Sequence, residues 1–430
     1  MWIPRELAEE LPRLAASFPV VVLTGPRQVG KTALLERTFP AYRFVPLDAG
    51  RNAEAAETRP EEFLDLHPPP AILDEIQYAP GLLRHLKARV DRHRGAGQYL
   101  LTGSQTFPLM QSVSESLAGR AAVVPMLGLS AAEWSAAGSL AGRDGSPGVR
   151  DGSPGVRDWT ELLWRGSFPA LWASEEAAPT RDRWYQGYVA TYLERDVRNL
   201  LHVGRLRDFE RFLRACAVRT GQLLNMSELG RDVGVSPTTA REWISVLHTS
   251  GQIVLLEPYH RSLGKRLVKS PKLYFADTGL AAYLAGFQSV EALRDSPMIG
   301  AFWENHVIAQ WVRYCDWRAP ALQLWFWQDR NGREVDLLLE TDQRLVPVEC
   351  KWTERPGPGD TAGIRRLRAL YGAAVTDGYV ASTTSEAFEV ASGVTAVPGW
   401  RLWPSPAGDL RAALTPPAGA REAIPSTRAR

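Results

Sequence analysis

The chain has 430 residues, 45% of them hydrophobic and 23% charged, which is the balance of a soluble globular protein with more than one domain. It contains no apolar run of about 18 residues, which excludes a membrane-spanning helix. Its three cysteines are widely spaced, which argues against a disulfide framework or a zinc site, and we expect a cytoplasmic protein. The net charge of +2 is close to neutral, so DNA binding would depend on local basic patches.

Lysine is rare in this chain. Only 6 of its 50 basic residues are Lys, and two of these, Lys31 and Lys351, lie in motifs typical of catalysis. Three more, Lys265, Lys269 and Lys272, lie together between those motifs. Because Arg supplies almost all of the ordinary surface charge, we interpret these Lys residues as functional.

Short apolar runs alternate with helical segments in residues 1–137. The runs 19–24, 70–73 and 98–102 predict buried strands. Continuous apolar strands between helices are typical of a parallel sheet that helices cover on both faces. The fold class expected for the whole chain is therefore α/β and multidomain, and residues 1–137 are expected to form its first domain, built on a parallel sheet.

The first motif is the sequence GPRQVGKT, which follows an apolar run and precedes a helical segment. Its glycines let the backbone wrap around phosphates, and the next helix points its N–H groups at the β-phosphate. Lys31 is expected to neutralise the β- and γ-oxygens, and Thr32 to bind Mg²⁺ beside ATP. The predicted nucleotide-binding residues are Gly25, Pro26, Arg27, Gln28, Val29, Gly30, Lys31 and Thr32.

An acidic pair ends the strand predicted at 70–73 and supports hydrolysis rather than binding alone. Asp74 is expected to lie near the Mg²⁺ of ATP, and Glu75 to polarise the attacking water. Ser104 follows the next predicted strand and is a candidate sensor of the γ-phosphate. The alternative for Ser104 is a helix cap.

Two further residues have two interpretations each. Arg120 is a candidate arginine finger that would stabilise the transferring phosphoryl group from a neighbouring subunit, or it is an ordinary surface Arg. Pro169, in the sequence GSFP, resembles the turn by which a helical lid touches adenine in some ATPases, or it belongs to a plain interhelical turn.

The middle of the chain predicts a linker, a lid and a winged helix. Residues 138–158 are rich in Gly, Pro and Ser and contain RDGSPGV twice, so we expect a mobile linker, and residues 159–225 are helical and predict a lid region. Residues 226–285 predict a winged helix with a capped helix near Ser236. Its predicted DNA-binding residues are Thr238, Thr239, Arg241, Arg261, Lys265, Arg266, Lys269 and Lys272. The alternative is a winged helix that only packs against the ATPase core.

Residues 286–403 predict a separate α/β unit of the restriction-endonuclease-like type. Asp336 lies on one predicted strand, and Glu349 and Lys351 alternate along the next, so they face the same side. Together with Glu304 from an upstream helix, the two acids would hold Mg²⁺, and Lys351 would orient water. The alternatives are a chance charged strand, or a nuclease fold kept only as a DNA clamp. Residues 404–430 predict a disordered tail.

The chain resembles a widespread prokaryotic family whose members join an AAA-type P-loop ATPase to a winged helix and a C-terminal restriction-endonuclease-like, PD-(D/E)xK, domain. The resemblance rests, in the family's order, on GPRQVGKT, ILDEIQ, LTGSQ, SLAGR, YLERDV and the pair GREVDLLLE and VECK. It covers nearly the whole chain except the repeat at 143–156. It implies ATP binding, Mg²⁺ and a cytoplasmic setting.

Three functions are compatible with these motifs. The first is an ATP-hydrolysing, DNA-binding motor or remodelling ATPase, acting on branched or duplex DNA as a ring oligomer such as a hexamer. The second is an ATP-gated, metal-dependent DNA nuclease of the defence type, and the third is an ATP-controlled signalling or transcriptional switch. The expected cofactors are ATP and Mg²⁺, and the expected partners are DNA and further copies of the chain.

Overall fold

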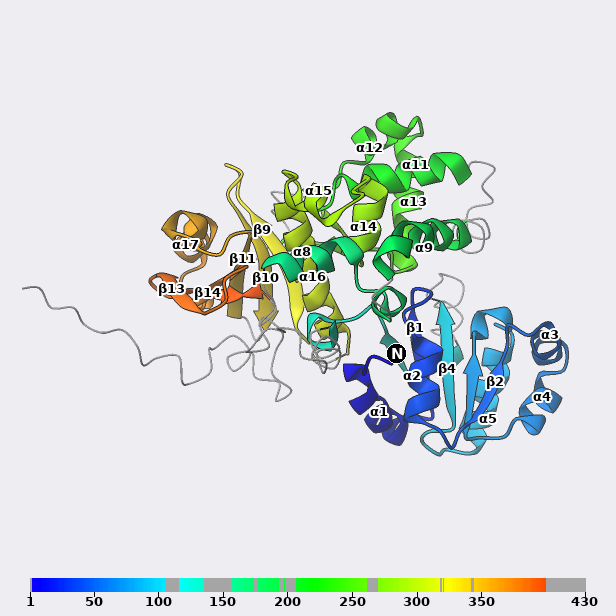
Figure 1. The fold of residues 1–430 in the computed structure, drawn as a ribbon. Helices are drawn as coiled ribbons and strands as arrows, with labels where there is room; N and C mark the ends of the chain where they lie inside the picture. The colour runs from blue at the N-terminus through cyan, green and yellow to red at the C-terminus, as the bar shows by residue number, and fades with distance from the viewer. Residues whose placement is uncertain are drawn as a thin grey trace, which may run out of the picture.

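The computed structural model describes residues 2–104, 116–134, 156–173, 177–192, 197, 206–260, 270–317, 319, 321–341 and 344–399. Figure 1 shows three regions: a parallel sheet with its helices, a mainly helical block, and a second sheet on the far side of the long helix α16. The repeat expected at 143–156 lies outside the described residues except for Val156, which begins helix α8, and so does the tail from 404.

The first region contains a five-stranded, fully parallel sheet with the strand order β2-β3-β4-β1-β5. Its strands are β1 Val20–Gly25, β2 Arg43–Pro46, β3 Ala71–Asp74, β4 Tyr99–Ser104 and β5 Ala121–Pro125. Its helices are η1 Glu6–Glu9, α1 Leu11–Ser17, α2 Lys31–Thr38, α3 Gly50–Thr58, α4 Pro60–Leu66, η2 Ile76–Tyr78 and α5 Leu82–Arg92.

Strand β1 shows why this sheet is covered on both faces. Val21 and Leu23 pack into one hydrophobic cluster, whereas Val20 and Val22 pack into another. Successive side chains of a strand point to opposite faces, so an unbroken apolar run fills two cores. The predicted P-loop type of α/β core is confirmed. The sequence did not predict β2, whose first two residues are exposed at the edge of the sheet.

The helical block begins inside the segment that we expected to be a linker. Its elements are α8 Val156–Arg165, η4 Pro169–Trp172, α9 Ala177–Tyr192, α11 Leu206–Ala217, α12 Met226–Val233, α13 Pro237–Thr249, α14 Thr278–Ala285 and α15 Val290–Arg294. A small antiparallel sheet, in the order β6-β8-β7, adjoins these helices. Its strands are β6 Gln222–Leu223, β7 Ile253–Leu256 and β8 Lys272–Phe275.

Local chemistry fixes the sharp turn between α12 and α13. Gly234 ends α12 in the left-handed region at φ 85°. The Ser236 hydroxyl caps α13 by accepting from the Thr239 N–H at 3.1 Å, and Pro237 occupies the first turn. Gly230 is also required, because a Cβ there would lie 2.7 Å from the Val235 carbonyl oxygen.

The third region is a six-stranded mixed sheet in the order β13-β14-β12-β11-β10-β9. Its elements are α16 Ile299–Trp317, β9 Gln323–Gln328, β10 Glu334–Thr341, β11 Arg344–Lys351, η6 Pro358–Thr361, α17 Ala362–Tyr371, η7 Gly372–Ala374, β12 Gly378–Ser382, β13 Phe388–Ala391 and β14 Val394–Pro398. Strands β9, β10 and β11 form an antiparallel meander, and β11, β12 and β14 run parallel.

One hydrophobic cluster joins all three regions. It contains Leu23 of the parallel sheet, Trp243 of the helical block and Trp303 of α16. The three regions therefore pack against one another through this cluster, and the first and third regions each contain a further cluster of their own. Among the residues that the structure describes, no helix combines the length and the hydropathy needed to cross a membrane.

Candidate functional site

The loop between β1 and α2 has the backbone shape of a phosphate cradle. Gly25, Gln28 and Gly30 have positive φ values of 145°, 67° and 94°, and a backbone that turns in this way can direct N–H groups at an anion. No larger residue fits at Gly25, because a Cβ would lie 2.0 Å from the Met126 carbonyl oxygen. The loop therefore packs directly against the segment that follows β5.

Lys31 lies within this cradle. Its side chain is buried, and its ammonium donates to the carbonyl oxygens of Gly25 at 3.0 Å and Pro26 at 2.9 Å. Both acceptors belong to the loop that surrounds the phosphate position. The ammonium is thus held where it would meet the β- and γ-phosphates of a bound nucleotide.

Asp74 joins the loop to the carboxyl end of strand β3. The Thr32 hydroxyl donates to Asp74 Oδ1 at 2.8 Å, and the Thr102 hydroxyl donates to the same oxygen at 2.5 Å. Burial raises the pKa of Asp74, and the two hydroxyl donors oppose that shift. A hydroxyl and a carboxylate in contact beside a phosphate cradle fit Mg²⁺, which prefers oxygen ligands.

Glu75 follows Asp74 in a strained backbone conformation. Its φ of 59° places a non-glycine residue in the left-handed region, and its N–H donates to the Thr102 hydroxyl at 2.9 Å. Its carboxylate accepts from the Gln77 amide. Thr102 therefore positions both acidic residues, although the sequence motifs did not single it out.

Ser104 lies at the carboxyl ends of the parallel strands, whereas Arg120 lies at their amino ends. Ser104 ends β4 in register with Gly25, beside the cradle. Arg120 precedes β5, where its carbonyl accepts from the Val20 N–H at 3.2 Å, so it is about 20 Å from the cradle along a six-residue strand. Its guanidinium pairs with Asp91 at 2.5 and 3.0 Å. Arg120 therefore does not meet Lys31 within one chain.

A cavity of about 340 Å³ separates the phosphate loop from helix α9. Trp184 and Tyr188 of α9 are stacked in it, with ring centroids 5.4 Å apart, and Phe168 packs against both rings. The lining residues are Arg27, Gln28, Arg183, Trp184, Gly187, Tyr188, Thr191 and Tyr192. Pro169, at the start of η4, is not among them, and the sequence motifs did not single out the α9 aromatics.

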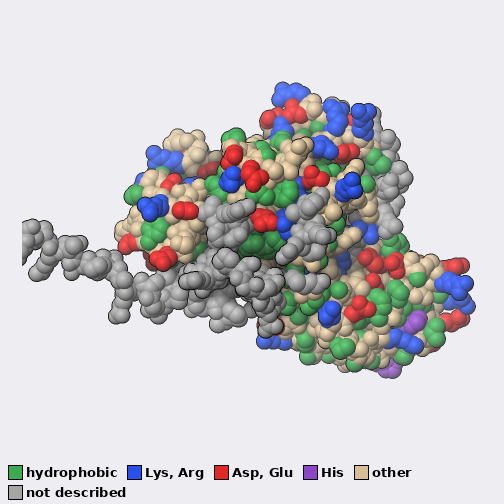
Figure 2. All heavy atoms as spheres, in the orientation of Figure 1, with side chains coloured by type: hydrophobic (Ala, Val, Ile, Leu, Met, Phe, Trp, Pro, Cys, Tyr) green, Lys and Arg blue, Asp and Glu red, His purple; other side chains and the backbone are tan. Residues whose placement is uncertain are grey.

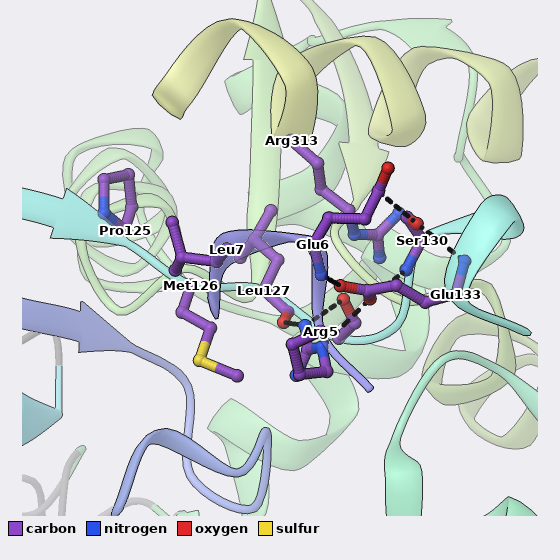
Figure 3. A pocket seen from close by; sticks show the side chains of 10 residues that line it. Arg5, Glu6, Leu7, Pro125, Met126, Leu127, Ser130, Glu133 and Arg313 are labelled. Carbon is purple, nitrogen blue, oxygen red and sulfur yellow. Dashed lines mark hydrogen bonds and ion pairs between the residues drawn. The ribbon is translucent and has the colours of Figure 1, made fainter. Parts of the chain in front are cut away.

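Arg5 supports the phosphate loop from behind. Its guanidinium donates to the Val29 carbonyl at 2.7 Å and pairs with Glu133 at 2.9 Å, with both side chains buried. Beside this pair lies a cavity of about 20 Å³, room for one water molecule. Figure 3 shows Arg313 reaching from α16 toward Glu6 and Ser130. Helix α16 of the third region therefore lines the same cavity as Arg5.

The predicted DNA-binding residues differ in their exposure to solvent. Thr238 and Arg241 are exposed near the start of α13, whereas Thr239 is half-buried and bonded to Ser236. On the face drawn in Figure 2, acidic side chains are interspersed with basic ones over the helical block. Arg261, Lys265, Arg266 and Lys269 lie outside the described residues.

Lys272 is almost fully buried, which contradicts the expectation that its side chain contacts DNA. Its side chain is only 4% exposed, and its ammonium pairs with Glu304 at 3.0 Å. The structure thereby brings Lys272 into the cluster expected to hold metal. That cluster contains Glu304, Asp336, Glu349 and Lys351.

The described residues contain no group of three or more His, Cys, Asp or Glu side chains arranged to hold a metal ion. Asp336 and Glu349 both pair with Lys351, at 3.4 and 3.1 Å. Asp336 also accepts from the Cys350 N–H at 2.8 Å. The predicted grouping of these side chains is present, but the carboxylates face ammonium groups, and the predicted metal site does not fit this arrangement.

Three family models match the chain in succession. An AAA domain matches residues 17–135, a domain of unknown function, DUF8612, matches 156–291, and another, DUF4143, matches 299–402. The uncharacterized protein Rv2008c of Mycobacterium tuberculosis is 34% identical over 364 residues, which span 82% of this chain and 74% of that protein. The uncharacterized protein Mb2031c of Mycobacterium bovis matches with the same values.

Solved structures resemble the chain more distantly. The Walker-type ATPase PABY2304 of Pyrococcus abyssi has a TM-score of 0.45 and 16% identity, covering 66% of this chain and 96% of that one. AMPPCP-bound DnaA from Aquifex aeolicus has a TM-score of 0.29 and 17% identity, covering 56% of this chain and 86% of that one.

Proposed function

The chain belongs to the same family as the mycobacterial protein Rv2008c and carries an AAA domain, and on that premise we propose that it is an ATP-hydrolysing, DNA-binding remodelling ATPase. The observation that carries the proposal is a set of polar and charged side chains at the carboxyl ends of the parallel strands. There, Lys31 lies in the phosphate cradle, and Thr32 and Glu75 converge on Thr102 and Asp74.

Each of these residues has one task in the proposed hydrolysis. Thr32 and Asp74 would hold the Mg²⁺ that accompanies ATP and neutralises its phosphates. Lys31 binds the β- and γ-oxygens and stabilises the charge that builds on them. Glu75 orients the attacking water and accepts its proton, and its strained backbone fixes where that carboxylate points.

The cavity beside α9 supports coupling between hydrolysis and movement. It separates Gln28 of the phosphate loop from Tyr188 of α9, so a nucleotide in the cradle would lie between the sheet and the helical block. Binding energy gained across such a gap favours closure of the two sides, and hydrolysis releases them. The helical block would therefore change its angle with nucleotide state.

The DNA-facing part of the proposal rests on α12 and α13. Two helices joined by the Gly234 turn, followed by the antiparallel sheet β6-β8-β7, support a winged helix whose α13 would face DNA. Exposed Thr238 and Arg241 suit phosphate contacts better than base recognition. We therefore propose binding that depends on the shape of the DNA rather than on its sequence.

The third region supports a restriction-endonuclease-like fold, through its mixed sheet and the placement of Asp336 and Glu349 on β10 and β11. We assign it a clamping rather than a cleaving role, because Lys272 and Lys351 already neutralise its carboxylates. A DNA nuclease is thus the less favoured function. An ATP-controlled transcriptional switch would instead require sequence-selective binding in the high-nanomolar range or tighter.

The test is steady-state ATP hydrolysis, alone and with single-stranded, duplex and four-way-junction DNA. Stimulation by one form of DNA is expected. Lys31→Ala should abolish nucleotide binding, whereas Glu75→Gln should keep binding and lose turnover, because it retains the shape of the side chain but not the base. Hydrolysis that ignores every DNA would overturn the remodelling function and favour a switch.

A further inference from the structure

Lys272 reaches from the small sheet into the carboxylate cluster of the third region. It begins strand β8, and its ammonium lies 3.0 Å from Glu304, 3.4 Å from Glu334 and 4.0 Å from Asp336. The three acids come from helix α16 and strand β10. The Lys272 ammonium therefore connects the small sheet to the third region. It lies between Glu304 and Asp336, which the sequence analysis assigned to a metal site.

The surroundings of Lys272 hold it in that position. Asn305, next to Glu304 on α16, accepts from the Phe275 N–H and donates to the Phe275 carbonyl, each at 2.7 Å. Tyr274 lies on the same side of β8 as Lys272, and its hydroxyl donates to Glu304 at 2.5 Å. Strand β8 is thus fixed to α16 by hydrogen bonds to Glu304 and to its neighbour Asn305.

The 3.0 Å distance from the Lys272 ammonium to Glu304 suits a charge-assisted hydrogen bond and is longer than a bond to Mg²⁺. Carboxylate oxygens bind Mg²⁺ at about 2.0–2.1 Å, whereas charge-assisted N–H···O bonds span about 2.7–2.9 Å or slightly more. A metal placed between Glu304 and Asp336 would meet the buried Lys272 ammonium, and two cations at one position repel. Lys272 and a metal are therefore mutually exclusive there.

We propose that Lys272 is the built-in cation of this cluster, occupying the place of a divalent metal and so converting a nuclease-type centre into an ion-paired joint between β8 and the third region. Buried carboxylates require a partner charge, and removing one partner from such a cluster leaves the others uncompensated. Replacing Lys272 by a neutral side chain removes the ammonium that pairs with Glu304, Glu334 and Asp336, so these carboxylates then need another cation.

The experiment measures Mn²⁺ binding to the full chain without nucleotide, by the loss of the paramagnetic resonance signal of free Mn²⁺. Wild type, Lys272→Ala, Lys272→Met and Asp336→Asn are compared, together with Lys272→Ala combined with Asp336→Asn. Lys272→Met keeps the aliphatic stem and replaces Lys272→Ala where the smaller side chain prevents folding. Subtracting the Asp336→Asn signal removes any Mn²⁺ that binds near the phosphate loop.

We expect no Asp336-dependent Mn²⁺ binding in wild type and about one ion per chain in Lys272→Ala, lost again in the double variant. Asp336-dependent binding in wild type would overturn the proposal. A folded Lys272→Ala or Lys272→Met protein that gains no Mn²⁺ would overturn it too. If neither variant folds, the wild-type titration alone decides, with bound Mn²⁺ against the proposal and none in its favour.

Discussion

At the residue scale, Thr102 connects the two acidic residues of the proposed ATP site. Its hydroxyl donates to Asp74 and accepts from the Glu75 N–H. Thr102→Val should lower kcat about 10- to 100-fold, because losing a hydrogen bond to a charged group costs about 1.5–3 kcal/mol. Steady-state hydrolysis measures the loss, and Thr102→Ser is the control that keeps the hydroxyl. Full activity in Thr102→Val would show that Glu75 is positioned otherwise.

The burial of His306 should make the folded protein less stable at acidic pH. Burial lowers its pKa to about 3, with Arg313 adding to the shift, and the ring packs against Trp303 and Trp159. A base with a lowered folded-state pKa binds protons mainly in the unfolded chain, so stability is lost as the pH falls below about 6.5. The loss reaches about 2 kcal/mol at pH 5.

His306→Phe should remove this part of the acid sensitivity while keeping the stacked rings. The measurement is the free energy of urea unfolding at pH 7.5 and at pH 5 for both proteins. Asp316, whose pKa burial raises to about 7, has the opposite pH dependence and is unchanged in both, so it cancels from the difference. Equal pH dependence in the two proteins would contradict the assignment to His306.

The continuous motifs predicted which residues the structure brings together at the proposed ATP site, but not the residues that support them. Lys31 and Asp74 lie at fixed spacings after apolar strands, and that spacing alone predicts their place at the edge of the sheet. Arg5 and Tyr188 also lie at the site, but they are distant from the motifs in sequence. No local sequence pattern indicates that their segments pack against the phosphate loop. Lys272 was misplaced because a Lys in a basic stretch has the same local signal whether exposed or buried.

At the element scale, Asp277 joins helix α14 to the turn that precedes η4. Its buried carboxylate caps Leu280 and also accepts from the Ser167 N–H and hydroxyl and from Tyr185. Asp277→Ala should lower the free energy of unfolding by about 3 kcal/mol or more, since it leaves several buried donors unpaired. Tyr185→Phe, which removes one of these donors, should cost about 1 kcal/mol. Urea denaturation measures both.

The elements that the sequence predicted best have an uninterrupted local pattern. Strands β10 and β11 contain Asp336, Glu349 and Lys351 as predicted, and helix α13 begins directly after the predicted cap at Ser236. Helix α8 was not predicted at its start, because Val156 closes the second copy of a Gly- and Pro-rich repeat. Strand β5, which pairs in parallel with β1, was not predicted although Ala121–Pro125 is apolar throughout.

At the scale of the whole molecule, Arg120 predicts an assembly. Because it lies at the amino ends of the strands, opposite the phosphate cradle at their carboxyl ends, it would reach a nucleotide only on a neighbouring copy. Arg120→Ala and Glu75→Gln should each lose hydrolysis, yet a mixture should regain part of it. In mixed assemblies, an Arg120→Ala subunit keeps Glu75 and receives Arg120 from its Glu75→Gln neighbour.

The measurement is hydrolysis against mixing ratio, with size determined by light scattering with and without ATP. Asp91→Ala is the matched control, because it removes the Asp91–Arg120 ion pair but leaves Arg120 in place. A mixture with no more activity than its components, or a monomer that still hydrolyses ATP, would rule out the finger in trans.

Helix α16 has a practical consequence for anyone who wishes to divide this protein. Its Gln310 accepts from the Ala131 N–H beside the ATPase core, its Asn305 binds strand β8, and its Trp303 donates to the Ala381 carbonyl of β12. A truncation before Ile299 would remove α16 and expose the apolar side chains that pack against it in all three regions. Expression trials of isolated pieces should therefore yield aggregates, and the smallest tractable unit for crystallisation includes this helix.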